Sequence, residues 1–241
     1  MRAWALVCAV GLLVSASTAW SAGINMAWDD CGIDGGAQNK DFACATNAGA
    51  SVVVCSFEPS QTNDANTVGL ELVIDVEPAA PELPTWWSFN GAGANCRGTA
   101  LSGNTTLPTT ALSCVDTFEG FALSTIAYDF ITGTPRARIR MAVAVAPDHK
   151  ASTSPGHEYF AGALVLSNKG TLGTECSGCA TPMCLGCNQL RVYAGDGSSF
   201  EFLGGPLARN WVGWQGRSVV TCPSEVPVRA RTWGAIKSQY R

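Results

Sequence analysis

The cysteines supply the sharpest chemical motif in the chain. Two CxxC units, Cys176-Ser-Gly-Cys179 and Cys184-Leu-Gly-Cys187, stand four residues apart. Four thiolates at such spacing could hold a zinc ion in a tetrahedron or an iron–sulfur cluster. The spacer is shorter than the roughly 12 or more residues that usually separate the two halves of such a zinc site. The spacing therefore favours disulfides, and a metal-binding protein at the CxxC pair is kept as an alternative.

An export signal bears on the oxidation state of these thiols. Arg2 precedes an apolar stretch at residues 3–14 and a run of small residues at 15–22, which is the pattern of a secretory signal peptide over residues 1–22. The apolar stretch is too short to cross a bilayer, and no later segment is apolar for the roughly 20 residues that a membrane helix needs. We therefore expect a secreted protein, extracellular or at the cell surface, without a transmembrane segment.

Removal of the signal would take one of the eleven cysteines with it and leave ten. An even number of cysteines in an exported chain indicates disulfides. Short separation and flanking turns predict that Cys31 pairs with Cys44 and Cys96 with Cys114, and the pairing of the other six stays open. The predicted disulfide cysteines are Cys31, Cys44, Cys55, Cys96, Cys114, Cys176, Cys179, Cys184, Cys187 and Cys222.

Carboxylates and histidines offer two further metal sites. Asp30, Asp34 and Asp41 stand at positions one, five and twelve of a calcium-loop register, although a glycine occupies position three and no helix flanks the segment. His149 and His157 lie at the two ends of one loop and could meet across its base as a surface zinc site. Turn-rich, solvated loops are the more common outcome for both patterns. We therefore expect no cofactor, with calcium or zinc as the alternative.

Two sets of side chains are candidates for binding a partner. An exposed indole from Trp86 or Trp87 would stack on a sugar ring or a partner protein, although in a strand one of the two would point into the core. Arg136, Arg138 and Arg140 alternate with apolar residues, so they would form a row on the wet face of a strand that suits acidic groups. The alternatives are core tryptophans and a wet sheet face with no ligand.

Period-two alternation of apolar and polar residues is the dominant pattern along the chain and indicates strands. Helical periodicity is nearly absent, and many short strands with turn residues between them favour an all-β, antiparallel two-sheet β-sandwich stapled by disulfides. Segments 141–145 and 159–167 are predicted to pair as a hairpin with a long loop. The predicted strands are 24–28, 51–57, 68–76, 124–131, 137–145, 159–167 and 189–193.

The predicted organisation has three parts: the signal peptide at 1–22, a β-sandwich domain at 23–226 with a cysteine-rich loop at 176–187, and a basic tail at 227–241. The tail should form a short amphipathic helix, which is marginal in water without a surface to dock on. That surface would be the sandwich itself or the export or surface-attachment machinery. The docking residues of the tail would be Trp233, Ile236, Lys237, Tyr240 and Arg241.

Charge excludes one class of partner. The net charge is −4, and carboxylates outnumber basic side chains within residues 23–188. A negatively charged domain repels the phosphates of a nucleic acid, so no nucleic-acid partner is expected.

Four segments resemble the cohesin and carbohydrate-binding jelly-roll sandwiches: VGLELVIDV, LPTWWSF, ARIRMAVAV and EYFAGALVLSN. The resemblance implies a β-sandwich over about residues 24–192. The segments AWDDCG, CSGCATPMC and TWGAIKSQYR resemble exported bacterial proteins that are uncharacterised, which implies export without supplying an activity. Cohesins usually lack cysteines, so pairing with a dockerin is not implied.

The function expected from the sequence is a non-catalytic secreted or cell-surface module that binds a protein or a glycan or forms part of a surface structure. With the cysteines in disulfides, only two histidines remain as possible bases, and no Ser-His-Asp or Cys-His arrangement is present. An extracellular hydrolase that uses paired carboxylates is kept as the alternative, because acidic residues are many.

Overall fold

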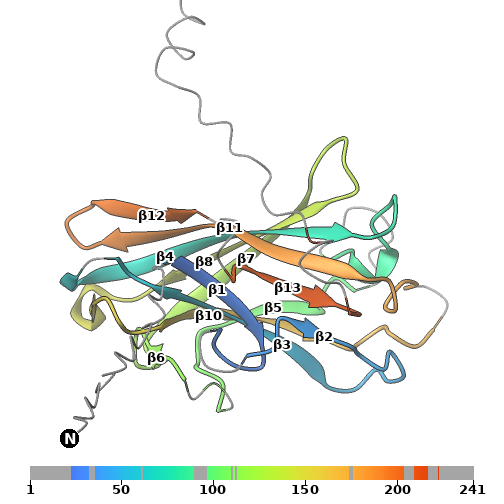
Figure 1. Cartoon of the computed structure of the whole chain (residues 1–241), viewed down its shortest axis with the longest axis horizontal. Coiled ribbons are helices and arrows are strands. Elements are labelled where there is room, and N and C mark those ends of the chain that lie inside the picture. The colour runs from blue at the N-terminus through green and yellow to red at the C-terminus, as the bar shows by residue number, and fades with distance from the viewer. Residues whose placement is uncertain are drawn as a thin grey trace, which may run out of the picture.

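The chain folds into two packed β-sheets, as a computed structural model shows (Figure 1). The structure describes residues 23–32, 36–60, 62–89, 97–109, 111, 113–173, 176–203, 209–216 and 222. Within these ranges the helical elements are two 3-10 turns, η1 (Thr85–Trp87) and η2 (Pro147–His149). The predicted all-β, two-sheet sandwich is therefore confirmed. The signal peptide and the tail helix lie outside the described residues and stay predictions.

One sheet has five strands, in the order β1 (Gly23–Trp28), β3 (Ala50–Glu58), β10 (Tyr159–Ser167) and β5 (Leu101–Asn104), and the short β6 (Val115–Asp116) pairs with β10. The three long pairings are antiparallel, whereas β6 runs parallel to β10. β10 shifts register between Phe160 and Gly162, which is a bulge of the kind that bends a strand.

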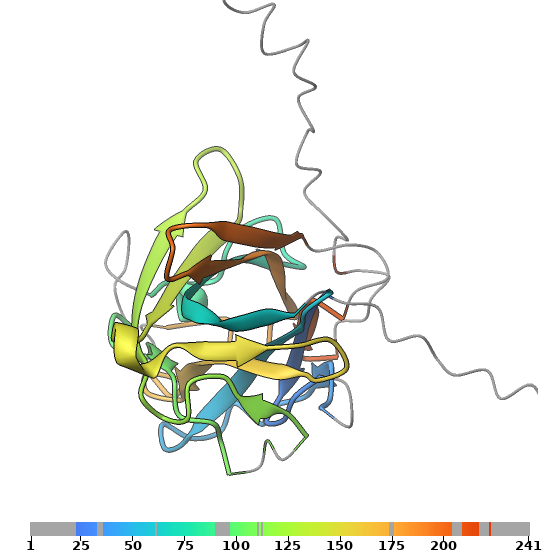
Figure 2. The ribbon, with the colours of Figure 1, turned by 90° about the vertical axis from the view of Figure 1, so that its left-hand side faces the viewer.

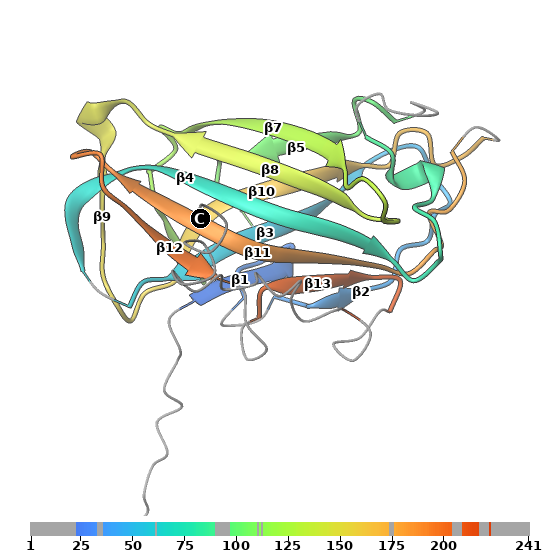
Figure 3. The same ribbon diagram turned by 90° about the horizontal axis from the view of Figure 1, so that it is seen from above.

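The other sheet has eight strands and forms the long face seen from above in Figure 3. Six strands lie side by side in the order β2 (Asn39–Lys40), β13 (Trp211–Trp214), β11 (Met183–Ala194), β4 (Asn63–Pro78), β8 (Ala137–Ala144) and β7 (Leu123–Phe130). Two more pair at the sides, β12 (Ser199–Leu203) with β11 and β9 (Ala151–Thr153) with β4.

The core lies between the sheets, and Figure 2 shows the strands running around it. It forms because alternate residues of each strand are apolar and point to the same face. On β4 these are Leu70, Leu72, Ile74 and Val76, all 0 or 1% exposed. At one end five aromatic rings pack together: Trp28, Phe42, Trp86, Trp87 and Trp214.

The expected hairpin between 141–145 and 159–167 is wrong. β8 lies in the eight-stranded sheet between β4 and β7, whereas β10 lies in the five-stranded sheet between β3 and β5. The segment between them is long enough to hold η2 and β9, and β9 adds to β4. The chain therefore crosses from one sheet to the other instead of turning back on itself.

The disulfides differ from the expected pairs. Cys31 is bonded to Cys114, Cys44 to Cys179 and Cys184 to Cys222, so both predicted pairings are wrong. The expectation used distance along the chain, whereas the sheets bring together segments that are far apart in sequence.

The CxxC pair is not a metal centre. Cys179 and Cys184 are in the disulfides just named, and Cys176 is disulfide-bonded as well. Three of the four sulfurs are therefore not thiolates, which overturns the metal-binding alternative at this motif. The expected loop at 176–187 is also shorter than predicted, because β11 begins at Met183.

Two cysteines, Cys55 and Cys187, carry free thiols in this structure and are buried. They differ in this respect from the expectation of ten oxidised cysteines. Cys96 lies outside the described residues. No helix in the described part of the chain is long and apolar enough to cross a membrane.

Candidate functional site

Both tryptophans expected to offer an exposed indole lie in the core instead. Trp86 and Trp87 are each 0% exposed. They belong to η1 rather than to a strand, so they do not point in opposite directions as successive strand residues would. Their rings pack against each other and against Trp214, with centroids 5.0 to 5.3 Å apart. The expected role of these indoles in stacking on a ligand is therefore wrong.

A buried arginine that the sequence did not single out holds this turn in place. The Arg97 guanidinium lies 3.3 Å from the centre of the Trp86 ring. It donates hydrogen bonds to the carbonyl oxygens of Trp86 at 2.7 Å, Lys169 at 3.0 Å and Ser167. Desolvation by burial lowers the pKa of Arg97 to about 9. Arg97 is thus a structural cation, with its N–H groups directed to the backbone.

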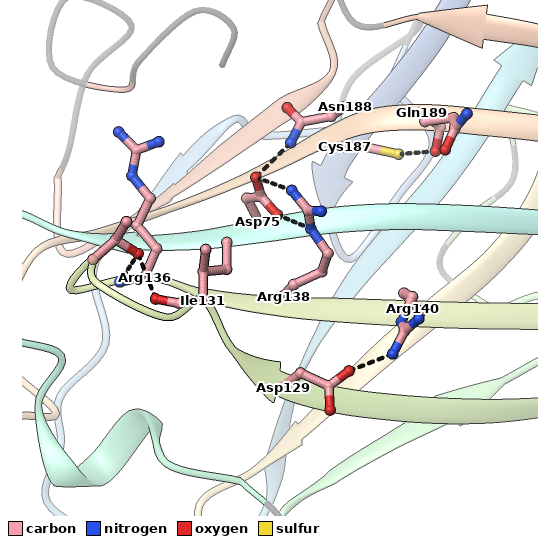
Figure 4. Close-up of polar contacts among 10 residues, drawn as sticks. Asp75, Asp129, Ile131, Arg136, Arg138, Arg140, Cys187, Asn188 and Gln189 are labelled. Atoms are coloured by element: carbon pink, nitrogen blue, oxygen red, sulfur yellow. Dashed lines mark hydrogen bonds and ion pairs between the residues drawn. The ribbon is translucent and has the colours of Figure 1, made fainter. Parts of the chain in front are cut away.

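The predicted row of arginines lies on the outer face of the eight-stranded sheet, as Figure 4 shows. Each member is ion-paired with a carboxylate from a strand beside it or from the adjacent end of β4. Arg136 pairs with Glu77 at 2.9 Å, Arg138 with Asp75 at 2.6 Å and Arg140 with Asp129 at 2.5 Å.

The pair at the centre of this row makes the most hydrogen bonds of the three. Arg138 reaches both oxygens of Asp75, at 2.6 and 2.9 Å, and Asn188 donates a third hydrogen bond to the same carboxylate at 2.8 Å. The hydrogen bond to Asp75 raises the pKa of Arg138 above its ordinary value. Carboxylates of the sheet itself balance these charges. The arginines are therefore better suited to stabilising the pairing of the strands than to recognising an acidic ligand.

Those of the residues expected to bind metal that the structure describes do not gather at one site. Asp30 accepts hydrogen bonds from the Cys31 amide at 2.7 Å and from Ser113 at 3.3 Å, and Asp41 is exposed. Asp34 lies outside the described residues. Among the residues that the structure describes, no three His, Cys, Asp or Glu side chains gather so that they could hold a metal ion.

The two histidines contact different aromatic rings. His149 stacks on Phe121 with ring centroids 3.8 Å apart and planes at 14°. His157 lies beside Tyr159, with centroids 6.3 Å apart.

A hollow of about 390 Å³ opens beside His149. Its walls come from β6 and the turn that follows it, from η2 and β9, and from the start of β10. These segments meet at one end of the sandwich, where connections between the two sheets cross. The lining residues are Val115, Asp116, Thr117, Phe118, Glu119, Phe121, Asp148, His149, Lys150, Ala151, Ser152 and Tyr159.

Large apolar side chains are exposed at this hollow. Val115 is 47% exposed and Phe121 54%, and Leu123, two residues beyond Phe121, is 80% exposed. These are three of the five large apolar side chains that are exposed in the described part of the chain. Apolar side chains that gather on a surface around a hollow mark an interaction site.

The backbone at the rim of the hollow is held in an uncommon conformation. Glu119 has a φ of 52°, in the left-handed region that residues other than glycine rarely adopt. The Phe121 amide donates a hydrogen bond to the Phe118 carbonyl at 2.9 Å, and this bond closes the turn that carries Glu119. The turn therefore directs a carboxylate to the rim at a cost in backbone energy.

A second hollow, of about 420 Å³, lies beside Phe130. Its only charged lining residue is Glu82. It offers fewer polar groups for recognition than the hollow at His149, which we treat as the candidate site.

The sequence did not indicate this site, except for His149. Phe121 and Val115 resemble ordinary core residues in a one-dimensional pattern, and only the sheet arrangement shows that they face solvent. The one signal in the sequence is the Glu-Gly pair at 119–120, which marks a turn.

Comparison with known proteins supplies no family for this chain. No family model matches the chain, and no curated protein matches it. Among solved structures it is similar to a cohesin module from a family 33 glycoside hydrolase of Clostridium perfringens, at 13% identity and a TM-score of 0.33, over 76% of this chain and 97% of that module. A superposition this loose transfers no property of that module to this chain.

Proposed function

We propose that the chain is a secreted, non-catalytic module that binds a protein partner at the hollow beside His149. The observation that carries the proposal is that Val115 and Phe121, both exposed, line a hollow of about 390 Å³, with Leu123 exposed two residues beyond Phe121. Exposed apolar side chains in one place lower the free energy of a complex by leaving water when a partner covers them. The disulfides support an oxidising compartment outside the cytoplasm.

The lining of the hollow favours a partner with an apolar side chain flanked by basic residues. The charged lining residues are three carboxylates, Asp116, Glu119 and Asp148, and one lysine, Lys150. The excess of negative charge attracts Lys or Arg on the partner and raises the rate of association. A protein fits better than a glycan, because the exposed apolar side chains other than Phe121 are aliphatic and have no ring to stack on a sugar.

The same residues give little support to the hydrolase alternative. A carboxylic acid that donates a proton in catalysis is usually held in apolar surroundings. Asp148 is 78% exposed, and its carboxylate lies 3.8 Å from the His149 ring nitrogen. The carboxylate of Asp116 is used within its own turn. These groups are suited to attracting charge rather than to transferring protons.

Site-specific photo-crosslinking tests the proposal and captures the partner in the same step. A benzophenone amino acid replaces Val115, which lines the hollow, in one variant and Leu172 in another, and each variant is made in cells that export the protein. Leu172 is a matched control, because it is 53% exposed and does not line the hollow. We expect one discrete protein adduct at position 115 and none at position 172, identified by mass spectrometry.

The partner is then purified and its affinity measured by calorimetry for the wild type, Phe121→Ala and Leu172→Ala. Truncation of an aromatic side chain at the centre of an interface typically costs about 2 kcal/mol, which corresponds to a loss of affinity of roughly 30-fold. Leu172→Ala should bind as the wild type does. Equal adducts at both positions, or an unchanged Kd for Phe121→Ala, would contradict the proposal. If the wild type binds to a glycan array and Phe121→Ala does not, the ligand at the hollow is a glycan and not a protein.

A further inference from the structure

Two thiols lie inside the sandwich, one on each sheet. Cys55 is on β3 of the five-stranded sheet, and Cys187 is on β11 of the eight-stranded sheet. Both are 0% exposed and belong to the same core cluster. On β3 the residues at 53, 55 and 57 all belong to this cluster, whereas Val54 packs in a separate cluster on the other face. The side chain of Cys55 therefore points between the sheets.

A short chain of backbone contacts joins the two positions. Cys55 is opposite Met26 of β1 in the sheet register. The Met26 amide donates to the carbonyl of Arg209 at 2.7 Å, and the next carbonyl, that of Asn210, accepts from the Cys187 amide, also at 2.7 Å. Asn210 in turn donates from its side chain to the Cys187 carbonyl at 2.9 Å. At this edge a single segment thus bridges the strand beside Cys55 and the strand of Cys187.

The electrostatics of the two thiols agree with this placement. Burial raises the pKa of Cys55 well above its ordinary value, and the charge of Cys187 raises it further. Burial also raises the pKa of Cys187, to about 12. The direction of this second effect fits two thiols that share one apolar core, because a charge on one sulfur acts on the other over short distances in such a medium.

The remaining cysteines leave each thiol one possible intramolecular partner in the described part of the chain. Cys31, Cys114, Cys44, Cys179, Cys184, Cys222 and Cys176 are all in disulfides. We propose that Cys55 and Cys187 are oxidised to a disulfide in the exported protein and so join the two sheets covalently through the core. The Sγ of Cys187 donates to the Gln189 carbonyl at 3.3 Å in the thiol state, and oxidation gives up this weak hydrogen bond.

The reaction is a thiol–disulfide exchange with a disulfide-bearing oxidoreductase of the export compartment. The thiolate of one cysteine attacks the disulfide of the oxidant and forms a mixed disulfide, which releases one thiolate of the oxidant. The second cysteine, after losing its proton, attacks the mixed disulfide at the sulfur of the first cysteine and releases the second thiolate of the oxidant. Two electrons pass to the oxidant, which leaves as a dithiol, and the cysteines lose two protons. Because the folded core keeps both thiols protonated, the exchange takes place before the sheets close.

Peptide mapping of the exported wild type tests the pairing directly. The protein is purified without reductant, denatured in an alkylating reagent, digested without reduction and analysed by mass spectrometry. We expect a linked peptide pair that contains Cys55 and Cys187, and no alkylation at either residue. Alkylation of both residues in the denatured protein would overturn the proposal, as would linkage of either one to a different cysteine.

A matched set of variants tests the consequence for stability. Cys55→Ala, Cys187→Ala and the double variant are compared with the wild type in thermal unfolding without reductant. If the disulfide is present, either single variant removes it, so both should lower the melting temperature by on the order of 10 °C. The double variant should then add little to the effect of either single variant. Independent, additive losses in the two single variants would overturn the proposal.

Discussion

Arg97 shows how one residue can hold a charge within an apolar core. Its planar guanidinium stacks on Trp86 and directs its N–H groups to three backbone carbonyls at once. An isolated buried charge would be costly, and these contacts replace the hydration that it loses. The residue therefore connects η1 to the end of β10 and fixes the tryptophan cluster.

Arg97→Lys should lower the free energy of unfolding by about 2–4 kcal/mol, because an ammonium group cannot replace the planar fork and leaves carbonyls unpaired. Urea denaturation followed by tryptophan fluorescence measures the change. Arg140→Lys is the control: its ion pair with Asp129 is more than half exposed, so a change within about 0.5 kcal/mol is expected. Equal effects of the two substitutions would show that the planar guanidinium of Arg97 does not contribute specially to the free energy of unfolding.

Glu119 carries both strain and charge at the candidate site. Glu119→Gly should raise the stability by up to about 1 kcal/mol, because glycine adopts its φ of 52° without strain. The same substitution should weaken binding of the crosslinked partner, because a carboxylate at the rim is lost. Glu119→Ala keeps the strain and loses the carboxylate, so it should weaken binding without any gain in stability. Calorimetry and thermal unfolding of both variants separate the two effects.

The strands hold the molecule together through pairs of side chains as well as through backbone hydrogen bonds. On the outer face, ion pairs join β4 to β8 and β8 to β7, and on the inner face alternate apolar residues pack into the core. Short connections are packed equally closely. Gly36, for example, donates to the Cys31 carbonyl at 3.1 Å, and its carbonyl accepts from Arg209 at 3.1 Å.

Gly36→Ala should destabilise the protein by on the order of 3 kcal/mol. A Cβ at this position would lie 2.3 Å from the Ala27 Cβ and 2.7 Å from the Cys31 carbonyl oxygen, and neither neighbour is a flexible side-chain end. Gly186→Ala in β11 is the matched control, because a Cβ there meets nothing within 4 Å. Thermal unfolding of the two variants should show a large loss only for Gly36→Ala, and a similar melting temperature for both would contradict the packing argument.

Across the whole molecule, covalent links supplement the core. Cys31–Cys114 and Cys44–Cys179 join connections that are far apart in sequence, and Cys184–Cys222 ties β11 to the segment that precedes the tail. The proposed link between Cys55 and Cys187 would join the sheets themselves. The three disulfides stabilise the sandwich that carries the hollow at its end.

The basic tail at 227–241 remains a candidate for docking on the export or surface-attachment machinery. Deletion of residues 229–241 tests this role. The same deletion should reduce attachment of the protein to the cell surface, measured by fractionation and immunoblotting. Unchanged export and attachment would reject this role for the tail.

Much of the fold could be predicted from the sequence because alternation is a local property. The strands at 68–76 and 137–145 follow from neighbouring residues alone, and the wet face that carries Arg138 follows from the same pattern. The even number of cysteines beyond the signal likewise predicts disulfides. Each of these inferences needs only the residue types and their spacing.

The tertiary structure decided what depends on contacts between distant segments. It placed β8 and β10 in different sheets, paired Cys31 with Cys114, and buried Trp86 and Trp87 together. It also exposed Phe121, which the sequence alone treats as any other apolar residue. Spacing along a chain determines which residues share a face of one strand, whereas the packing of one sheet on another determines which faces meet and which stay open to solvent.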